Sequence, residues 1–390
     1  MNKPFSIYIH IPFCIQKCPY CDFNTYAVAK APEKEYVSAL LAELDYRASL
    51  PEWRGRTVQT IFFGGGTPSI FSGKAIKHIL SHITRLFPLL DYVEVSLEAN
   101  PGTVATDNLS EFYDAGVNRL SFGGQSFNST TLKTLGRTHS PDQIIAAVES
   151  SRAALFSNIS MDIIYGVPGQ TIHDVRYDCE QAVQLDLPHA STYSLTIEKG
   201  TPFYQSYKRG VFKPIDDDLS LEMMDTIQQT LFDRGHGLER YEISNFAKPG
   251  KEARHNMAYW NADDYLGIGA GAHSLCFNRR WSNMALPQSY INKATTLGNA
   301  ESWEETLTLR DQMFEYFFLG LRKIHGTSLT EFERRFEHPW EPLYGDLIDI
   351  LTTERLLVHD GDYIRLSQRG LEIADSVIEN FSKVNLPTPV

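Results

Sequence analysis

The sequence lacks the features that mark membrane-spanning and nucleic-acid-binding proteins. No apolar run approaches the roughly 20 residues that a helix needs to cross a bilayer, and the start, MNKPFSIYIHIPF, lacks the layout of a signal peptide. Lys and Arg number 36 against 48 Asp and Glu, a net charge of −12, which argues against binding to phosphate backbones. We therefore expect a cytoplasmic protein with no transmembrane segment and no nucleic-acid partner.

Cysteine is scarce, with five residues in a chain of 390, which excludes a disulfide framework. Three of the five, Cys14, Cys18 and Cys21, nevertheless lie together in the segment CIQKCPYCDF. Because cytoplasmic thiols stay reduced, such clustering indicates metal or redox chemistry. The isolated Cys179 and Cys276 are expected to be ordinary thiols.

Short apolar runs alternate with amphipathic segments over the first 200 residues or so. Several of the amphipathic segments open on Ser, Thr or Asp, as helix N-caps do. This alternation predicts an α/β fold with a parallel sheet of six strands. The expected strands are 6–11, 58–64, 93–99, 117–124, 159–166 and 191–197, and the expected helices are 34–50, 72–87, 106–116, 140–155 and 171–185.

Polar or glycine-rich residues lie near the ends of successive predicted strands. The cysteine loop follows the first strand, GGGTP follows the second, Glu98 ends the third and Gln125 ends the fourth, while Asp162 and Tyr193 lie within the fifth and sixth. An open, doubly wound sheet is one possible arrangement. A site gathered at one mouth is typical of barrels, so we favour a partial (β/α)6 TIM-type barrel.

The regular alternation of apolar runs and amphipathic segments ends at about residue 200. The segment 213–235 predicts a helix with an acidic start, and 238–250 a strand-like run. The end, 347–381, predicts a helix, a hairpin that turns at Asp360–Gly361–Asp362, and a helix, an α+β ending that indicates a winged-helix-like module with little basic character. The expected regions are the barrel over 1–210, a linking region over 211–305 and the winged-helix-like domain over 306–390.

The cysteines follow a C-x₃-C-x₂-C spacing, and thiolates are ligands for zinc or for iron–sulfur clusters. A structural zinc site needs a fourth ligand, and the nearby His10 lies in the preceding strand. Three thiolates on a tight loop suit three corners of a 4Fe–4S cluster, with one iron left open. A zinc-bound regulatory protein with a winged-helix tail is the alternative.

The stretch YIHIPFCIQKCPYCDF resembles the opening of the radical S-adenosylmethionine superfamily, and most of all its oxygen-independent coproporphyrinogen III dehydrogenase branch. The resemblance runs from about Ser6 into the C-terminal module. It implies that Cys14, Cys18 and Cys21 bind a 4Fe–4S cluster whose open iron takes the amino and carboxylate groups of S-adenosylmethionine. It also implies an electron donor for the cluster.

The same resemblance implies roles for the glycine-rich loop after the second strand. Gly65, Gly66 and Thr67, in GGGTPS, would receive the methionyl end of S-adenosylmethionine and touch its adenine. Glycines suit this role because they let a ligand approach backbone N–H groups closely. A plain tight turn before a helix is the alternative interpretation.

Further cofactor residues follow from the resemblance. Glu98 and Arg137 would hold the amino-acid part, since an acid pairs with an ammonium and an arginine clamps a carboxylate. Gln125 and Asp162 would bind the ribose hydroxyls, and Tyr8 would lie near the sulfonium. Each of these residues alone could equally be a structural polar group.

Two features distinguish members of the branch. The dehydrogenases carry a further cysteine two positions after the third, where this chain has Phe23. The stretch RHNMAYW fits an H-N-x-x-Y-W pattern with His255, Asn256, Tyr259 and Trp260. Both features resemble the haem chaperones of the branch, which pass haem to haem-requiring proteins such as membrane-bound respiratory enzymes.

The resemblance implies that haem is carried as cargo with His255 as iron ligand, because a neutral imidazole is a common haem ligand and aromatic rings offer flat apolar surface. His273, in GIGAGAHS, is a second candidate. Both could instead be structural histidines. We expect a haem chaperone rather than an enzyme; the alternative is an oxygen-independent coproporphyrinogen III dehydrogenase that forms protoporphyrinogen IX.

Overall fold

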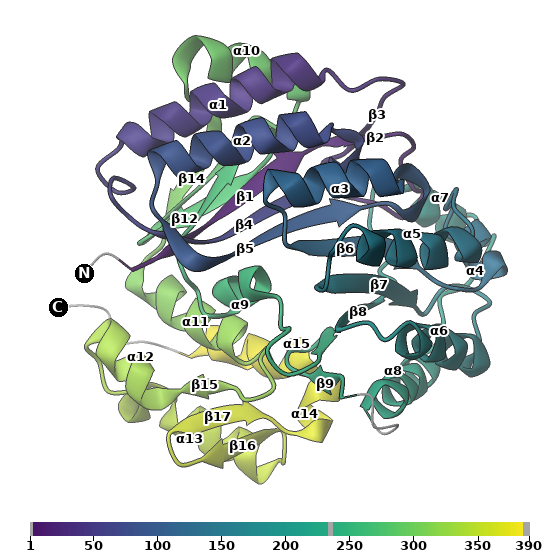
Figure 1. The fold of residues 1–390 in the computed structure, drawn as a ribbon. Helices are drawn as coiled ribbons and strands as arrows, with labels where there is room; N and C mark the ends of the chain where they lie inside the picture. The colour runs from purple at the N-terminus through teal and green to yellow at the C-terminus, as the bar shows by residue number, and fades with distance from the viewer. Residues whose placement is uncertain (1–2, 233–236, 385–390) are drawn as a thin grey trace.

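The computed structural model describes residues 3–232 and 237–384, and a large mixed sheet forms its centre (Figure 1). The six predicted strands are confirmed; they lie side by side in chain order, and all of these neighbours pair in parallel. In β1 six of the seven residues are buried, as expected of a strand covered on both faces. The strands are β1 (Phe5–Ile11), β4 (Val58–Gly65), β5 (Leu89–Ala99), β6 (Arg119–Gln125), β7 (Ile159–Tyr165) and β8 (His189–Ser194).

The five predicted helices are also confirmed, each to within a few residues at its ends. Ser72, Ser140 and Thr171 cap three of them, each accepting a hydrogen bond from the third helical amide, which stabilises the start of a helix. Figure 1 shows α1, α2 and α3 side by side over one face of the sheet. The helices are α1 (Glu33–Ser49), α2 (Gly73–Leu86), α3 (Thr106–Ala115), α5 (Pro141–Ala153) and α6 (Ile172–Gln184), with a short α4 (Ser129–Thr134) that the pattern did not predict.

The region predicted to be a link supplies the outer strands of the central sheet. The sheet has twelve strands in the described residues; four lie beyond β1 and two beyond β8. They are β9 (Glu239–Arg240), β10 (Asn245–Ala247), β11 (Tyr265–Ile268), β12 (His273–Cys276), β13 (Arg279–Asn283) and β14 (Glu301–Thr306). The strand-like run predicted over 238–250 contains β9 and β10. The other four strands were not predicted, because strands this short leave little periodicity in the sequence.

Four helices accompany these strands: α7 (Pro202–Lys208), α8 (Asp217–Phe232), α9 (Arg254–Trp260) and α10 (Pro287–Leu297). The predicted helix over 213–235 is therefore present as α8, and its last three positions lie outside the described residues. The HNMAYW stretch forms α9, which contacts β4 of the central sheet.

The C-terminal elements have a core of their own, in which Phe317, Phe332, Tyr344 and Phe381 stack on one another. The predicted hairpin is confirmed, since β16 and β17 pair antiparallel across Gly361, but the last predicted helix is broken into α14 and α15. The elements are α11 (Leu309–Gly320), β15 (Thr327–Ser328), α12 (Leu329–Phe336), α13 (Glu341–Thr353), β16 (Leu357–Asp360), β17 (Tyr363–Leu366), α14 (Gln368–Glu372) and α15 (Ala374–Glu379).

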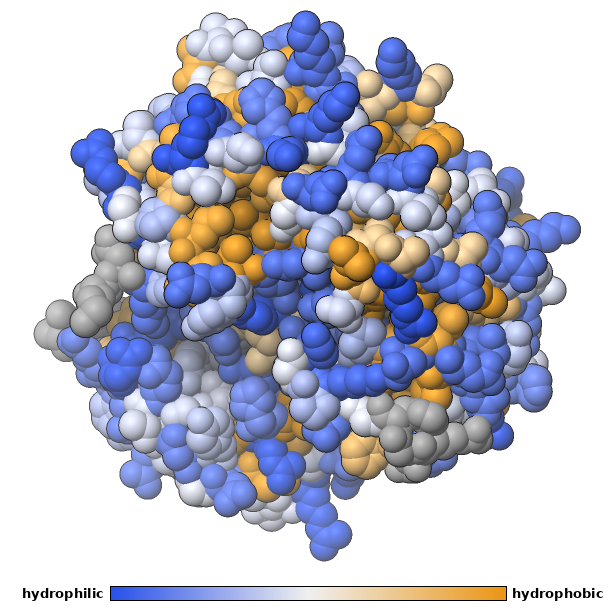
Figure 2. Space-filling view, in the orientation of Figure 1, coloured by the Kyte–Doolittle hydropathy of each residue, from blue (hydrophilic) through white to orange (hydrophobic). Residues whose placement is uncertain are grey.

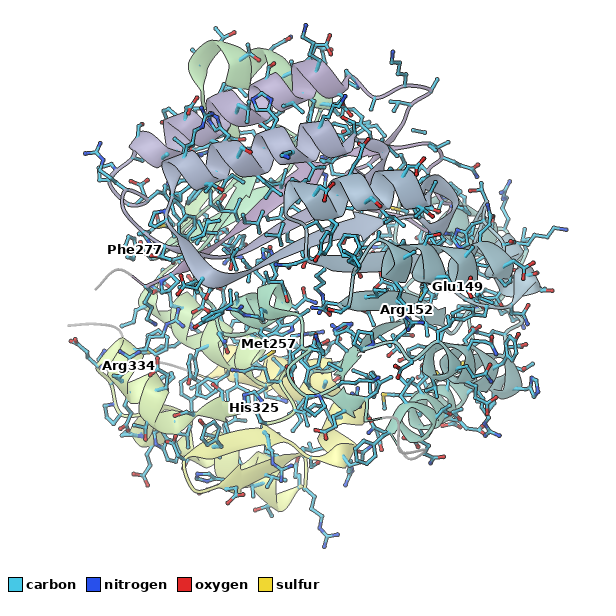
Figure 3. The ribbon with its side chains drawn as sticks, viewed as in Figure 1. Glu149, Arg152, Met257, Phe277, His325 and Arg334 are labelled. Carbon is cyan, nitrogen blue, oxygen red and sulfur yellow. The ribbon has the colours of Figure 1, made fainter. Side chains whose placement is uncertain are left out.

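The surface is hollowed between the central sheet and the C-terminal elements, and hydrophilic residues predominate there (Figure 2). A cavity of about 840 Å³ lies at this junction, with Trp260, Lys323 and Arg335 in its wall. In Figure 3, Met257 of α9 and His325, just before β15, mark the two sides that meet. Among the described residues, none of the helices is long and apolar enough to cross a membrane.

Candidate functional site

The three clustered cysteines lie on the loop after β1. Pro12 ends that strand, and a two-residue strand, β2 (Phe13–Cys14), pairs with β3 (Tyr26–Ala27), which ties the two ends of the loop together. Cys14 is buried, and Cys18 and Cys21 are partly exposed. The remaining cysteines are buried elsewhere: Cys179 in α6 and Cys276 in β12. Within the described ranges, no three His, Cys, Asp or Glu side chains are arranged to hold a single metal ion.

Hydrogen-bond donors from other loops reach the sulfur atoms. Thr67 Oγ1 donates to Cys14 Sγ at 3.5 Å, and Arg137 Nη1 donates to Cys18 Sγ at 3.3 Å. Hydrogen bonds to the sulfurs are a common feature of iron–sulfur sites. The chemistry of these donors therefore fits an iron–sulfur cluster on this loop.

The glycine-rich loop after β4 packs directly on the β1 strand and the cysteine loop. Gly65 has φ +117°, and a Cβ there would lie 2.6 Å from the His10 ring; a Cβ on Gly66 would lie 2.6 Å from the Phe13 carbonyl oxygen. Only glycine fits both positions. The Gly65 N–H donates to Glu98 Oε2 at 3.0 Å, so the loop and the end of β5 meet.

Glu98, Gln125 and Asp162 come together because they end or occupy three neighbouring strands, β5, β6 and β7. Ser121 Oγ donates to Asp162 Oδ1 at 3.3 Å. The Gln125 Oε1 atom is buried and has no hydrogen-bond partner among the described residues. An unpaired buried acceptor is costly, so Gln125 fits a ligand that offers a hydroxyl or N–H donor, as a ribose does.

The two carboxyl groups at this edge have displaced pKa values. Burial raises the pKa of Glu98 to about 8, with a further contribution from the negative charge of Asp162. Burial also raises the pKa of Asp162 to about 6, against the hydrogen bonds from Ser191 and Ser121. Two acids held near each other in a desolvated site favour a cationic ligand, which would restore their charge.

Arg137 follows α4 and turns toward the same edge. Besides its bond to Cys18, it donates from Nη2 to the Gly123 carbonyl oxygen at 2.6 Å. Its Nε is buried without a partner among the described residues. Arg137 therefore lies between the cysteine loop and β6, and its Nε–H is free to donate to a ligand such as a carboxylate.

A cavity of about 410 Å³ opens at this edge of the sheet. Its wall contains residues of the predicted site together with residues of the segment 259–273. The lining residues include Tyr8, His10, Phe23, Gly65, Glu98, Tyr259, Tyr265 and His273. The Phe23 side chain, at the position where the dehydrogenases carry cysteine, is 67% exposed at this cavity.

His255 lies behind the cavity wall with both ring nitrogens in hydrogen bonds. Nδ1 is 2.8 Å from Thr60 Oγ1, and Nε2 is 3.0 Å from the Tyr259 hydroxyl. Because Thr60 Oγ1 donates to Ser6 Oγ, we assign the proton to Nδ1, and Nε2 accepts from Tyr259. The side chain is 1% exposed, and burial lowers its pKa to about 3, so the ring is neutral.

The other residues of the H-N-x-x-Y-W stretch point in different directions. Tyr259 lines the cavity beside Glu98. Trp260 lines the separate cavity at the C-terminal junction, where the Arg322 guanidinium lies 5.0 Å from its ring centroid. Asn256 is partly exposed. The structure thus does not gather the four motif residues around one pocket.

Sequence reasoning missed His10 as a site residue. Its ring lies between the Tyr8 hydroxyl, at 2.9 Å from Nδ1, and the Asn24 carbonyl oxygen, at 3.0 Å from Nε2. The signal was present in the alternation of SIYIHI, because residues two apart in a strand share a face, and Tyr8 was already a candidate. Asn24 and Tyr265, by contrast, reach the cavity only through tertiary contacts.

Two protein-family models match parts of this chain. A model of the Radical SAM superfamily matches residues 8–182, and a model of the HemN C-terminal domain matches residues 307–373. The solved structure of coproporphyrinogen III oxidase (HemN) from Escherichia coli, a radical SAM enzyme, is similar with a TM-score of 0.84 and 23% sequence identity. The match covers 98% of this chain and 90% of that one, and at that identity it supports the fold.

Two curated relatives are similar over nearly their whole length. The heme chaperone HemW of Lactococcus lactis subsp. lactis is 36% identical over 381 residues, 98% of each chain. The heme chaperone HemW of Escherichia coli is 34% identical over 389 residues, which cover 97% of this chain and 98% of that one. Since both matches run through the cysteine loop, the sheet edge and the C-terminal module, this chain belongs to the HemW family of radical SAM proteins.

Proposed function

We propose that this protein is a haem chaperone, which binds haem and delivers it to haem-requiring proteins. The observation that carries the proposal is the 36% identity, over 98% of both chains, to a protein described as a heme chaperone. Phe23 at the cavity, in place of the further cysteine of the dehydrogenases, points the same way. Haem-accepting partners such as membrane-bound respiratory enzymes, an electron donor and a cytoplasmic location complete the proposal.

Cys14, Cys18 and Cys21 would hold a 4Fe–4S cluster, with one iron open toward the cavity. When bound, the cluster and S-adenosylmethionine supply one-electron chemistry. Thr67 donates a hydrogen bond to the sulfur of Cys14 and Arg137 donates one to the sulfur of Cys18, bonds that also suit sulfurs bound to iron. These residues therefore serve first to bind and orient the cofactors.

The remaining predicted residues would bind S-adenosylmethionine around the same cavity. Glu98 and Arg137 would bind its amino and carboxylate groups, and Tyr8 would lie near the sulfonium. The unpaired Oε1 of Gln125 supports a bond from a ribose hydroxyl, and Asp162 would accept the other. The glycine-rich loop, with Gly65, Gly66 and Thr67, would bind the methionyl end of S-adenosylmethionine and touch its adenine.

The proposed architecture divides the chain at the predicted boundaries. Residues 1–210 would form the partial (β/α)6 barrel around the cofactors, and 211–305 would carry the haem-associated motif. Residues 306–390 would form the winged-helix-like module, which the helix, hairpin and helix order supports. The parallel order of β1 and β4 to β8 supports the barrel.

His255 is proposed as an iron ligand of the cargo. Its Nε2 carries the lone pair, and its Nδ1–H donates to Thr60, the arrangement usual for an imidazole that binds a metal. Iron can reach Nε2 only after Tyr259 gives up its hydrogen bond, so this ligation requires α9 to rearrange. Titration of haem into wild type and His255→Ala, followed by absorbance, tests this role; equal affinity and equal spectra would exclude it.

Two anaerobic experiments test the proposed function. In the first, cluster-loaded protein charged with haem is mixed with a haem-free acceptor, and we expect the haem spectrum to move to the acceptor. In the second, cluster-loaded protein is incubated with coproporphyrinogen III, S-adenosylmethionine and a one-electron reductant such as dithionite, and we expect no protoporphyrinogen IX. Formation of that product would establish the dehydrogenase alternative instead.

A further inference from the structure

The GIGAGAHS turn has a construction that the proposed cofactor site does not explain. Two of its glycines approach backbone too closely for any side chain: a Cβ on Gly267 would lie 2.0 Å from the His273 carbonyl oxygen, and one on Gly269 2.5 Å from the His10 carbonyl oxygen. A Cβ on Gly271 would lie 2.3 Å from the side-chain amide nitrogen of Asn24. Gly269 and Gly271 also have φ of +111° and +74°. The turn therefore packs closely against His10 and Asn24 in the cavity wall.

The turn ends at a histidine that lies in the cavity wall and is accessible to solvent. His273 begins β12, lines the cavity and has an exposed side chain. In the part of the chain that the structure describes, its ring makes no hydrogen bond. Burial and the nearby Arg280 lower its pKa below the ordinary value for histidine, so the ring is neutral near pH 7. An exposed, neutral imidazole without a partner is available to a metal.

On the outside of the cavity, the aromatic Trp303 and the charged Arg280 lie near His273. Strand pairing aligns His273 with Ser282 and Ser282 with Trp303, so the imidazole and the indole share one face of the sheet, with ring centroids 6.3 Å apart. Trp303 is 43% exposed and Phe23 67% exposed. Asn24 Nδ2, in the cavity wall, donates to the Ala285 carbonyl oxygen at 3.0 Å.

We propose that His273 is an axial ligand of haem iron and that Phe23 and Trp303 contact the porphyrin at the mouth of this cavity. The inference rests on the proposed haem-chaperone function and names where the cargo binds. An imidazole is a common ligand of haem iron, and exposed aromatic side chains offer flat apolar surface for the porphyrin ring. Unlike His255, His273 needs no hydrogen bond to be broken before it meets iron.

The placement also relates the cargo to the cofactor site. Tyr8, Gly65 and Glu98 are only partly exposed and form the inner wall, whereas Phe23 and His273 are exposed at the rim. Haem on His273 would therefore lie over the inner part of the cavity that we assign to S-adenosylmethionine. Cargo and cofactor would be neighbours across one opening.

The test is an anaerobic titration of haem into cluster-loaded wild type, His273→Ala and His78→Ala, recorded as difference absorbance against the same protein without haem. His78 is an exposed histidine on α2 outside the cavity wall and serves as the matched control. We expect His273→Ala to bind haem at least tenfold more weakly and with a shifted Soret band, and His78→Ala to match wild type. Added imidazole should restore the wild-type spectrum of His273→Ala.

A second variant separates loss of a ligand from loss of the fold. His273→Met replaces the imidazole with a thioether, so we expect binding with a spectrum distinct from that of wild type and of His273→Ala. Iron and sulfide contents equal to wild type show that each variant is folded. If wild type takes up haem and His273→Ala matches it in affinity and spectrum, the His273 proposal is wrong and the chaperone proposal stands. If wild type takes up no haem, both are wrong.

Discussion

The carboxyl edge of the central sheet and the α9 segment both carry the residues that the motifs single out, yet their polar groups are in opposite states. At the sheet edge, Gln125 Oε1 and Arg137 Nε lack partners among the described residues, and the pKa of Glu98 is raised to about 8 by burial and Asp162. In α9, both ring nitrogens of His255 are paired, with Thr60 and with Tyr259.

The difference teaches how to separate ligand sites from structural polar networks. A buried polar group without a protein partner costs free energy unless a ligand supplies the partner. The sheet edge therefore has the character of a site made for a polar cofactor. The His255 network is complete without a ligand, so any role it has in binding haem requires it to open.

The largest expected effect is the loss of the cluster from the cysteine loop at the sheet edge. Substitution of Cys14, Cys18 or Cys21 by Ser should abolish binding of a 4Fe–4S cluster, because each thiolate holds one corner. Cys179→Ser, in a buried position of α6, should keep the full iron and sulfide content. Iron and sulfide analysis of anaerobically reconstituted protein measures this; a full cluster in any of the first three variants would contradict the assignment.

The next effect concerns the buried acid near the end of β5. Glu98→Gln should weaken binding of S-adenosylmethionine about 10- to 100-fold, because a hydrogen bond to a charged group contributes about 1.5–3 kcal/mol. Equilibrium binding by calorimetry with cluster-loaded protein measures the loss. Glu149→Gln, on the exposed side of α5 and labelled in Figure 3, is the control and should bind like wild type.

Binding of S-adenosylmethionine should also depend on pH through the same residue. With a pKa of about 8, Glu98 is mostly protonated at pH 7, and a bound ammonium requires it to ionise. Affinity should therefore rise as the pH rises toward 8, by at most about tenfold per unit for one released proton, and then level off. Glu98→Gln should flatten this dependence; a wild-type profile that is flat between pH 6.5 and 8 would contradict the role.

The smallest expected effect is on stability, and it concerns the hydrogen bond between Tyr259 and His255 in α9. Tyr259→Phe removes one hydroxyl and leaves His255 Nε2 without its donor, so the free energy of unfolding should fall by about 1 kcal/mol. Urea unfolding followed by circular dichroism measures it. His78→Ala, at an exposed position of α2, should change stability by less than about 0.5 kcal/mol. An unchanged midpoint for Tyr259→Phe would mean that the His255 network contributes no stability.

Most of the fold was predictable from the chain. The alternation of apolar runs and capped amphipathic segments located β1 and β4 to β8 and their helices, because local periodicity reflects burial in a parallel sheet. The cysteine spacing and the glycine-rich loop located two parts of the site for similar local reasons. The strand-like run predicted over 238–250 contains β9 and β10, whereas β11 to β14 were not predicted because strands of four to six residues carry little periodicity.

The sequence by itself determined which chemistry is available: three thiolates on one loop, a glycine cradle, and carboxyl, amide and imidazole groups at strand ends. Only the tertiary structure decided which of these groups are free. Two histidines of equal standing in the sequence end in different states, since α9 buries His255 between Thr60 and Tyr259, whereas a turn of close-packed glycines exposes His273 at the cavity. The physical reason is that hydrogen bonding and burial depend on partners far apart in the chain, which residue spacing does not record.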